Sequence, residues 1–347
     1  MVGPGRSMVA VAAIAALTGV SASPADLRNE LHAAASTYYA NVVALAPLVG
    51  RESAFDYLQR LYDDADVLGD STLSYGYTQD EWTAYLDNEA TLDLSLVQQI
   101  MARQFRPIGS IRGLGETVVR SSVDGTMQPV AVYVPSSYRP DRAAPLVVFL
   151  HGHPQSETDL LSPPFVAALA ERTGSILIAP YGRGEYDFRK TASDVYDALD
   201  AATSAFSIDR RRRYLVGYSM GGFSVFEVGP VRPRDWDAVM SISGGLLGHD
   251  AQAVLSTMRL TPFYVLTGSA DTSVPTQYPA STAAFLQSRG IPVSFYSQPG
   301  GLHRLITLLP VLSEAWDDMH GSIVRTPPAL AQVPLPLTAP SGTLEKQ

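Results

Sequence analysis

Ser219 lies in a glycine spacing that is typical of a catalytic nucleophile. The apolar run Tyr214-Leu215-Val216 leads directly into Gly217-Tyr218-Ser219-Met220-Gly221, and a helical stretch follows. A strand, a tight turn and a helix in this order crowd the backbone around the serine, which favours glycine two positions before and after it and exposes the hydroxyl. The N–H of Met220 and the positive end of the helix would then stabilise an oxyanion forming beside Ser219. We therefore predict nucleophilic catalysis by Ser219.

A serine hydroxyl needs a general base within hydrogen-bond reach, and the chain offers six histidines. His303 follows the last strand-like run in the loop Gly300-Gly301-Leu302-His303, just before the final helical stretch. We predict His303 as the base, because its place suits the chain order serine, acid, histidine. His32 and His320 are interpreted as structural, and His249, beyond a strand end, is a less well placed candidate.

The acid that orients the histidine is expected between Ser219 and His303 in the sequence, also at a strand end. Asp271 has this position in Gly268-Ser269-Ala270-Asp271, directly after an apolar run. Asp250, after the preceding strand, is the alternative. For either aspartate, capping of a loop or helix is the simpler structural interpretation.

The stretch His151-Gly152-His153-Pro154 follows the third predicted strand, where the second oxyanion donor is expected. Gly152 lets the backbone turn so that the N–H of His153 can face the site. His151 is interpreted as a structural anchor of this loop. Two imidazoles invite a metal interpretation, but carboxylates at ligand spacing are lacking on the adjacent strands. We therefore predict neither a metal nor another cofactor.

These residues need a sheet whose strand ends converge, and the chain from about Ile111 has that pattern. Short apolar runs alternate with helical stretches, which predicts an α/β fold with a mostly parallel sheet and helices on both faces. Asp124-Gly125 is a hairpin signal between the first two runs, so these should be antiparallel. The eight predicted strands are Ile111 to Arg120, Gln128 to Val134, Leu146 to Leu150, Ser175 to Ile178, Tyr214 to Val216, Ala238 to Ile242, Phe263 to Leu266 and Val293 to Tyr296.

A small helical region precedes this sheet. Apolar residues recur at helical spacing over Asp26 to Ala46, Ser53 to Leu68 and Glu81 to Phe105, and Thr78 with Glu81 forms a capping-box pattern. The acidic residues of these helices are interpreted as solvated. The predicted organisation is a signal peptide over 1–25, a helical region over 26–105, a catalytic domain over 106–325 and a Pro-rich disordered tail over 326–347.

The N-terminus supplies an argument about the compartment. Met8 to Val20 is an apolar run that follows Arg6 and precedes small residues, as in a secretory signal. The run is shorter than the roughly 20 residues that a membrane-spanning helix needs. Cleavage near Ala22 or Ala25 would leave a secreted or periplasmic protein without a membrane anchor.

Charge and composition narrow the classes of partner. The chain has 25 Lys and Arg against 34 Asp and Glu, a net charge of −9, and its excess of acid lies between Arg51 and Gln99. Nucleic acids need clustered basic residues, so we predict no nucleic acid partner. The basic run Arg210 to Arg213 is interpreted as a solvated loop. The absence of cysteine excludes disulfides and thiol catalysis.

Together these motifs resemble the α/β-hydrolase superfamily over about Gly115 to Met319. The resemblance rests on His151-Gly152, Gly217 to Gly221, Gly268 to Pro275 and Gly301 to His303. It implies an oxyanion loop, a nucleophile, an acid and a base at these positions. The chain looks most like secreted serine esterases of the feruloyl-esterase-like and polyester depolymerase-like kinds, and the catalytic domains of prolyl-oligopeptidase-type peptidases are also similar.

The sequence thus predicts a serine hydrolase that cleaves small-molecule or polymeric carboxylic esters through an acyl-enzyme on Ser219. Tyr218, Tyr181 and Tyr186 are predicted to flank an acyl or aryl group, with core packing as the alternative explanation. A prolyl-oligopeptidase-type peptidase or an acyltransferase with the same triad is the alternative activity. A non-catalytic binding protein on the same scaffold is a third class, which the intact triad disfavours.

Overall fold

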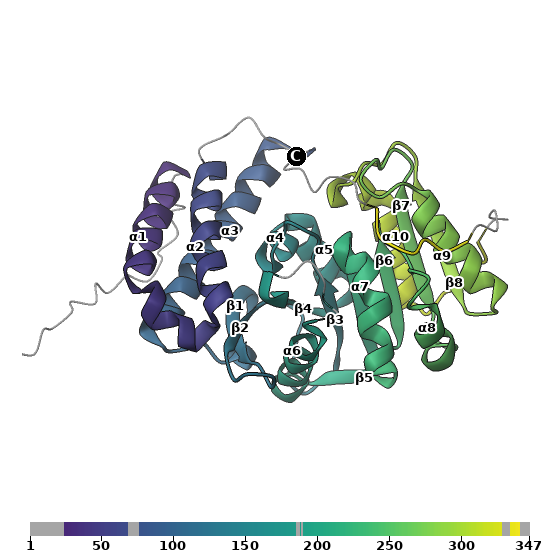
Figure 1. Ribbon diagram of the computed structural model, residues 1–347, viewed down its shortest axis with the longest axis horizontal. Coiled ribbons are helices and arrows are strands. Elements are labelled where there is room, and N and C mark those ends of the chain that lie inside the picture. Colours follow the sequence, from purple (N-terminus) through teal and green to yellow (C-terminus); the bar gives the residue numbers. More distant parts are fainter. Residues whose placement is uncertain (1–23, 69–75, 185–187, 189, 328–333, 341–347) are drawn as a thin grey trace, which may run out of the picture.

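The computed structural model describes residues 24–68, 76–184, 188, 190–327 and 334–340. Three helices, α1 (Pro24–Val49), α2 (Arg51–Leu68) and α3 (Gln79–Ala102), pack together at one end of the molecule (Figure 1). We call residues 24–102 the N-terminal helical region. Its apolar faces enclose a core of their own, in which Leu31, Tyr38 and Ile100 are fully buried. The predicted helical region is therefore confirmed.

The start of α3 follows from its capping box. The N–H of Glu81 donates to the side chain of Thr78, and the Glu81 carboxylate accepts from the N–H of Thr78 (2.9 Å). The helix ends at Ala102 rather than at the predicted Phe105. Arg103 has a left-handed backbone (φ 52°), and its N–H closes the last turn on the carbonyl of Gln99.

Eight strands form one sheet in the order β1-β2-β4-β3-β5-β6-β7-β8. β1 pairs antiparallel with β2, β2 pairs antiparallel with β4, and the other neighbours are parallel. The predicted sheet, with its antiparallel first hairpin, is confirmed. The strands are β1 (Gly113–Arg120), β2 (Met127–Val134), β3 (Ala144–Leu150), β4 (Ile176–Pro180), β5 (Ile208–Tyr218), β6 (Ala238–Ile242), β7 (Phe263–Gly268) and β8 (Val293–Gln298).

Strand β5 begins earlier than predicted and takes in Arg210 to Arg213, so the interpretation of this run as a loop is wrong. Carboxylates accompany the arginines. Arg212 pairs with Asp209 (2.8 Å), and Arg213 pairs with Asp235 (2.9 Å). Because these charges are neutralised locally, a polar segment can extend the strand.

Helices cover both faces of the sheet, because its central strands are apolar on both sides. Along β3, Val148 belongs to one core while Val147 and Phe149 belong to the other. The first core is covered by α6 (Ala192–Ala205), α7 (Met220–Val228), α8 (Ala251–Thr257) and α9 (Gln277–Ser288), and the second by α4 (Glu157–Leu161), α5 (Pro164–Thr173) and α10 (Leu309–His320). Short 3-10 turns are η1 (Ile108–Ser110), η2 (Gly182–Gly184), η3 (Gly229–Val231), η4 (Pro233–Asp235) and η5 (Leu305–Leu308).

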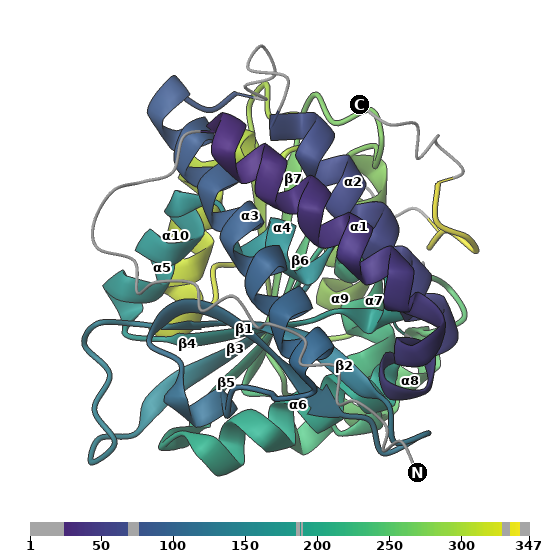
Figure 2. The ribbon, with the colours of Figure 1, turned by 90° about the vertical axis from the view of Figure 1, so that its left-hand side faces the viewer.

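The N-terminal helical region lies across β1, β2 and α4 (Figure 2). Gln99 of α3 donates to the carbonyl of Glu116 on β1 (3.0 Å). The predicted solvation of the helical acids is wrong for Glu89 and Asp93 of α3, which are 4% and 2% exposed. They face Arg60 of α2 and the start of α4 instead of water.

Part of the tail that the sequence predicts as disordered lies against the first core of the sheet. Leu335 packs on the first core, and the N–H of Gly248 donates to the carbonyl of Pro336 (2.8 Å). Packing of the half-buried Leu335 and this hydrogen bond hold this part of the tail in place. Tail residues 328–333 and 341–347 and the predicted signal peptide up to residue 23 lie outside the described residues. In the part of the chain that is described, no helix has the length and apolar character to cross a membrane.

Candidate active site

The nucleophile turn has the geometry that its glycines predict. Ser219 joins β5 to α7 with φ 55° and ψ −115°, a backbone that non-glycine residues rarely adopt. A Cβ added to Gly217 would lie 2.1 Å from the carbonyl oxygen of Gly221, so glycine is required there. The N–H of Ser219 donates to the carbonyl of Ile242 on β6 (2.9 Å). These contacts hold Ser219 just beyond the end of β5, with Met220 first in α7.

Ser219, His303 and Asp271 form one chain of hydrogen bonds. Nε2 of His303 lies 2.8 Å from Oγ of Ser219, and Nδ1 lies 2.7 Å from Oδ2 of Asp271. The Asp271 side chain is fully buried, and its other oxygen accepts from the N–H of Val274 (2.8 Å). The structure therefore brings together the three residues that the sequence selected from three different strand ends.

This arrangement can activate a hydroxyl. When Nδ1 of His303 carries the proton and donates to the Asp271 carboxylate, Nε2 is the nitrogen that accepts from Ser219. The same carboxylate would stabilise the imidazolium that forms when the serine proton is transferred. The His303 side chain is 21% exposed, so the chain of hydrogen bonds reaches the surface at this residue.

Tyr218 contacts the histidine of this chain. Its ring stacks on the imidazole of His303 with centroids 5.3 Å apart, and its hydroxyl donates to the His303 carbonyl (2.8 Å). Burial raises the pKa of Tyr218, so the phenol keeps its proton and remains a donor. Tyr218 thus holds the loop that carries His303, while its predicted contact with substrate stays a prediction.

The predicted oxyanion loop, residues 151–155, lies beside Ser219. The N–H of Gly221 donates to the carbonyl of His151 (3.0 Å), and a Cβ added to Gly152 would lie 3.0 Å from Cβ of Ser219. The loop backbone comes this close because residue 152 has no side chain. Burial, together with the neighbouring His151, lowers the pKa of His153. The roles of the Met220 and His153 amides toward an oxyanion stay predictions.

The other two tyrosines predicted at the substrate differ in their placement. Tyr181 follows β4, and its ring stacks on Tyr57 of α2 with centroids 5.1 Å apart. It is 4% exposed, and its hydroxyl donates to Asp56 (3.3 Å). These contacts are of the core-packing kind that the sequence analysis left open. Tyr186 lies outside the described residues.

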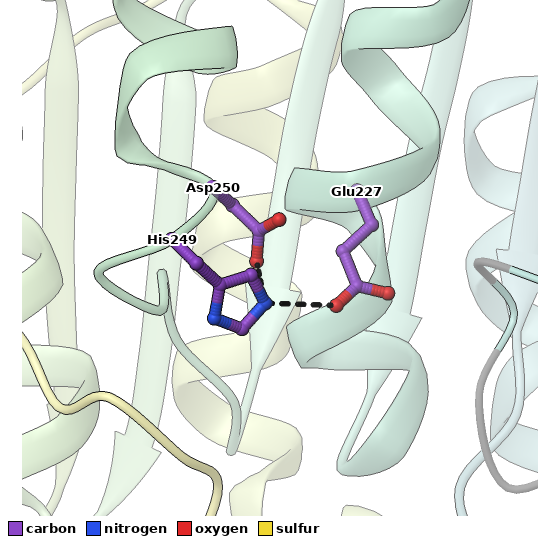
Figure 3. A group of neighbouring side chains, drawn as sticks. All are labelled: Glu227, His249 and Asp250. Carbon is purple, nitrogen blue, oxygen red and sulfur yellow. Dashed lines mark ion pairs between the residues drawn. The ribbon is translucent and has the colours of Figure 1, made fainter.

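The alternatives for acid and base lie in a separate cluster with Glu227 of α7 (Figure 3). Nε2 of His249 is 3.1 Å from Oδ2 of Asp250 and 3.9 Å from Oε1 of Glu227. One ligand atom from each residue lies within 4.8 Å of the others, so the cluster can form ion pairs or hold a metal ion. The sequence analysis missed Glu227, because only the fold brings α7 beside the loop of His249.

A sequence model described as "Alpha/beta hydrolase family" matches residues 147–342 of this chain, which include the oxyanion loop, Ser219, Asp271 and His303. The chain belongs to the alpha/beta hydrolase family. The resemblance inferred from the glycine, serine and histidine motifs is thus confirmed at the level of the family. The sheet order and the two helical layers of this alpha/beta hydrolase agree with that assignment.

Individual relatives are more distant. The bifunctional acetylxylan esterase/xylanase XynS20E of Neocallimastix patriciarum is 30% identical over 107 residues, which are 29% of this chain and only 16% of that protein. The crystal structure of a thermostable esterase has a TM-score of 0.51 at 19% identity and covers 61% of this chain and 63% of its own. The structure of the ferulic acid esterase AmCE1/Fae1A from Anaeromyces mucronatus, in complex with ferulic acid, has a TM-score of 0.50 at 17% identity. The match covers 60% of this chain and 91% of that esterase. The two solved structures share the fold of this alpha/beta hydrolase.

Proposed function

We propose that this alpha/beta hydrolase is a serine esterase that forms an acyl-enzyme on Ser219. The observation that carries the proposal is the pair of hydrogen bonds at His303, whose Nε2 accepts from Oγ of Ser219 (2.8 Å) while its Nδ1 donates to Asp271 (2.7 Å). A hydroxyl on a strained turn, next to an imidazole that a buried carboxylate orients, is what acyl transfer needs.

In the acylation half of the reaction, Oγ of Ser219 attacks the carbonyl carbon of the ester while its proton passes to Nε2 of His303. The carbonyl oxygen becomes an oxyanion, which the N–H groups of Met220 and His153 stabilise. The carbon–oxygen bond to the alcohol then breaks, and the alcohol leaves with the proton from His303. Asp271 stays ionised and keeps the imidazolium oriented.

Deacylation repeats these steps with water in place of the serine. His303 takes a proton from the water, whose oxygen attacks the acyl carbon and forms a second oxyanion in the same place. The bond from the acyl carbon to Oγ breaks, the proton returns to Ser219, and the carboxylic acid leaves. Atoms and protons balance over acylation and deacylation with the ester, water and these side chains.

The relatives support an ester as the substrate. XynS20E is by its name an acetylxylan esterase, and the structures that share the fold include a ferulic acid esterase. We therefore propose small-molecule or polymeric esters with short acyl or aryl groups as the substrate class. Peptide cleavage or acyl transfer is the alternative, because the same three residues serve either chemistry.

The test is covalent labelling by a fluorophosphonate probe, with the labelled residue mapped by peptide mass spectrometry. We expect the label on Ser219 in the unaltered protein and in Ser256→Ala, a control that removes an exposed hydroxyl of α8. Ser219→Ala should take no label. Label on another serine, or none at all, would contradict the proposal.

A comparison of substrates separates esterase from peptidase. We expect kcat/KM for p-nitrophenyl acetate or methyl ferulate to exceed that for a peptide p-nitroanilide by at least about 10², or roughly 2.7 kcal/mol in transition-state stabilisation. If Ser219 is labelled but the amide is hydrolysed faster than the ester, the result would favour the peptidase alternative.

A further inference from the structure

The ring of His151 lies between two backbone carbonyls at the start of the oxyanion loop. Its Nδ1 is 2.8 Å from the carbonyl oxygen of Gly152, and its Nε2 is 2.8 Å from that of Tyr181. The ring is 2% exposed, and the edge of Phe188 packs on it with centroids 5.0 Å apart. A ring nitrogen donates to the carbonyl it faces only when that nitrogen carries a proton, and the packing of Phe188 keeps the ring between the loop and the end of β4.

The contact with Gly152 bears on the amide that faces the nucleophile. The carbonyl of Gly152 and the N–H of His153 belong to one trans peptide group, so they point in opposite directions. With the carbonyl held at His151, the N–H of His153 is directed away from the imidazole. Gly152 itself lies against Ser219. The position of the His151 ring therefore sets the direction of the proposed oxyanion donor.

The N-terminal helical region holds the other partner of His151. Tyr181, whose carbonyl contacts the imidazole, stacks its ring on Tyr57 of α2 at an interplanar angle of 26°. Its hydroxyl donates to Asp56, one residue before Tyr57. Helix α2 thus reaches the oxyanion loop through two buried side chains, Tyr181 and His151.

The same region also holds the far end of the loop, where α4 begins. Arg60 of α2 donates to the carboxylate of Glu157 (3.0 Å) and to the hydroxyl of Thr158 (2.8 Å). On α3, Tyr85 donates to Asp159 (2.7 Å), and Asn88 donates to the carbonyl of Ser162 (2.8 Å). The five residues 151–155 therefore run between two points that α2 and α3 fix.

We propose that the N-terminal helical region acts as a positioning element for the oxyanion loop, with Tyr57 and Arg60 as its main positioning residues. The inference rests on the proposed function of Ser219. It assigns these helices a role in stabilising the transition state, because a donor that is displaced from the oxyanion loses most of its effect.

A pair of substitutions at Tyr57 tests the proposal. The Tyr57 hydroxyl has no hydrogen-bond partner among the described residues, so Tyr57→Phe keeps the stacking on Tyr181 and should retain full activity. Tyr57→Leu removes the stacking. We expect Tyr57→Leu to lower kcat roughly 10-fold or more and to leave KM unchanged. For comparison, the loss of a whole oxyanion donor lowers kcat by about 10²- to 10³-fold.

The value of kcat is calculated per active site, and the active sites are counted by titration with the fluorophosphonate. A variant that only reduces the amount of folded enzyme therefore keeps the kcat of the unaltered protein. Tyr62→Leu is the matched control, because it makes the same change at an exposed position of the same helix and should leave kcat unaltered. A Tyr57→Leu enzyme with the kcat of the unaltered protein, or with a raised KM alone, overturns the proposal.

A second variant covers the case in which Tyr57→Leu does not fold. Tyr85→Phe removes only the hydroxyl that donates to Asp159, and we expect a kcat per site about 2- to 10-fold lower, since the loss of one such bond loosens the loop without removing a donor. Full activity of Tyr85→Phe would then reject the proposal. If the unaltered protein itself had no titratable site and hydrolysed no ester, the proposed function would have failed instead.

Discussion

Ser219 illustrates how a proposed nucleophile depends on its neighbours. A serine with a positive φ outside the common backbone regions is disfavoured by about 1–3 kcal/mol, and the surrounding structure must hold it there. Its N–H is bonded to Ile242 on β6, and the glycines at 217 and 221 remove the clashes that side chains would cause. His303 and Asp271 then complete a unit in which each member depends on the others.

At this scale we expect Ser219→Ala and His303→Ala each to lower kcat by roughly 10⁴ to 10⁶, with a smaller loss for Asp271→Asn. The double variant of Ser219 and His303 should be hardly worse than either single one, because the residues act as a unit. Steady-state kinetics on a p-nitrophenyl ester measures these losses. Asp250→Asn is the matched control, and a crippled Asp250→Asn beside a mild Asp271→Asn would show that the acid is misassigned.

Among the elements, α3 depends on its cap and on its buried face. Thr78 and Glu81 satisfy free amides at its first turn, and hydrogen bonds from Thr78 lower the pKa of Glu81. One face of the helix carries Glu89 and Asp93 into the contact with α2 and α4. The position of α3 therefore links helix stability to its contacts with Asp159 and Ser162, which flank the proposed oxyanion loop.

Removal of the cap should destabilise the protein measurably. Thr78→Ala is expected to lower the free energy of unfolding by roughly 0.5–2 kcal/mol, since it leaves an amide of the first turn without a partner. Thr83→Ala is the control, because the Thr83 hydroxyl bonds to the carbonyl of Gln79 within the helix, and its loss should be neutral or slightly stabilising. Urea denaturation compares the two. Equal effects would show that the cap is unimportant.

The buried acids between the elements make stability depend on pH. Burial raises the pKa of Glu116 on β1 well above its usual range; the nearby Glu157 of α4 and Asp93 of α3 raise it further, while Arg60 of α2 opposes the shift. A raised pKa in the folded state means that the unfolded chain releases this proton more readily. This contribution to stability is therefore complete below about pH 4 and is lost as the pH rises toward the folded-state pKa.

Glu116→Gln cannot ionise and should remove this loss. We expect the variant to match the original protein below about pH 4 and to be more stable by roughly 1 kcal/mol at pH 8. Asp63→Asn, at an exposed site of α2, should leave the pH dependence unchanged. Thermal unfolding followed across this pH range gives the comparison, and a constant difference at all pH values would be evidence against a buried neutral carboxyl.

Among the described residues, three large apolar cores account for most of the buried side chains. Two lie on opposite faces of the sheet and one lies inside the N-terminal helical region, and Tyr77 packs against both the third core and the core beneath α5 and α10. The helical region is therefore joined to the catalytic domain by apolar contacts as well as by the buried charges around Arg60. This continuity is consistent with the positioning role proposed for the helical region.

Export is a prediction about the whole chain. If residues 1–25 are a secretory signal, the mature protein should lack about its first 22 to 25 residues. Intact-mass measurement of the protein recovered from culture medium or periplasm checks this. Replacement of the apolar Leu17 by Arg should block export, whereas a change of the nearby polar Thr18 to Ser should not. A mature chain that begins at Met1 would contradict the assignment.

The sequence by itself determined the chain order of the strands, the helical layers, and the places of Ser219, His303 and Asp271 after strand ends. These follow from local rules, since apolar runs predict buried strands, and glycine spacing marks a turn that only small residues can make. Only the tertiary structure decided that His303 bonds to Asp271 while Asp250 pairs with His249, because both aspartates follow strand ends and differ only in where the chain places them.

Long-range contacts account for the rest. Periodicity identified the helices but not the burial of Glu89 and Asp93, because acids on a helix are solvated or buried according to what packs on them. Arg60 and Glu157 are 97 residues apart in the sequence and meet only after α2 docks on α4. Nothing local to Tyr181 distinguished a substrate contact from a contact with Tyr57. The physical reason is that such docking is fixed by the complementarity of whole surfaces, which no short segment carries.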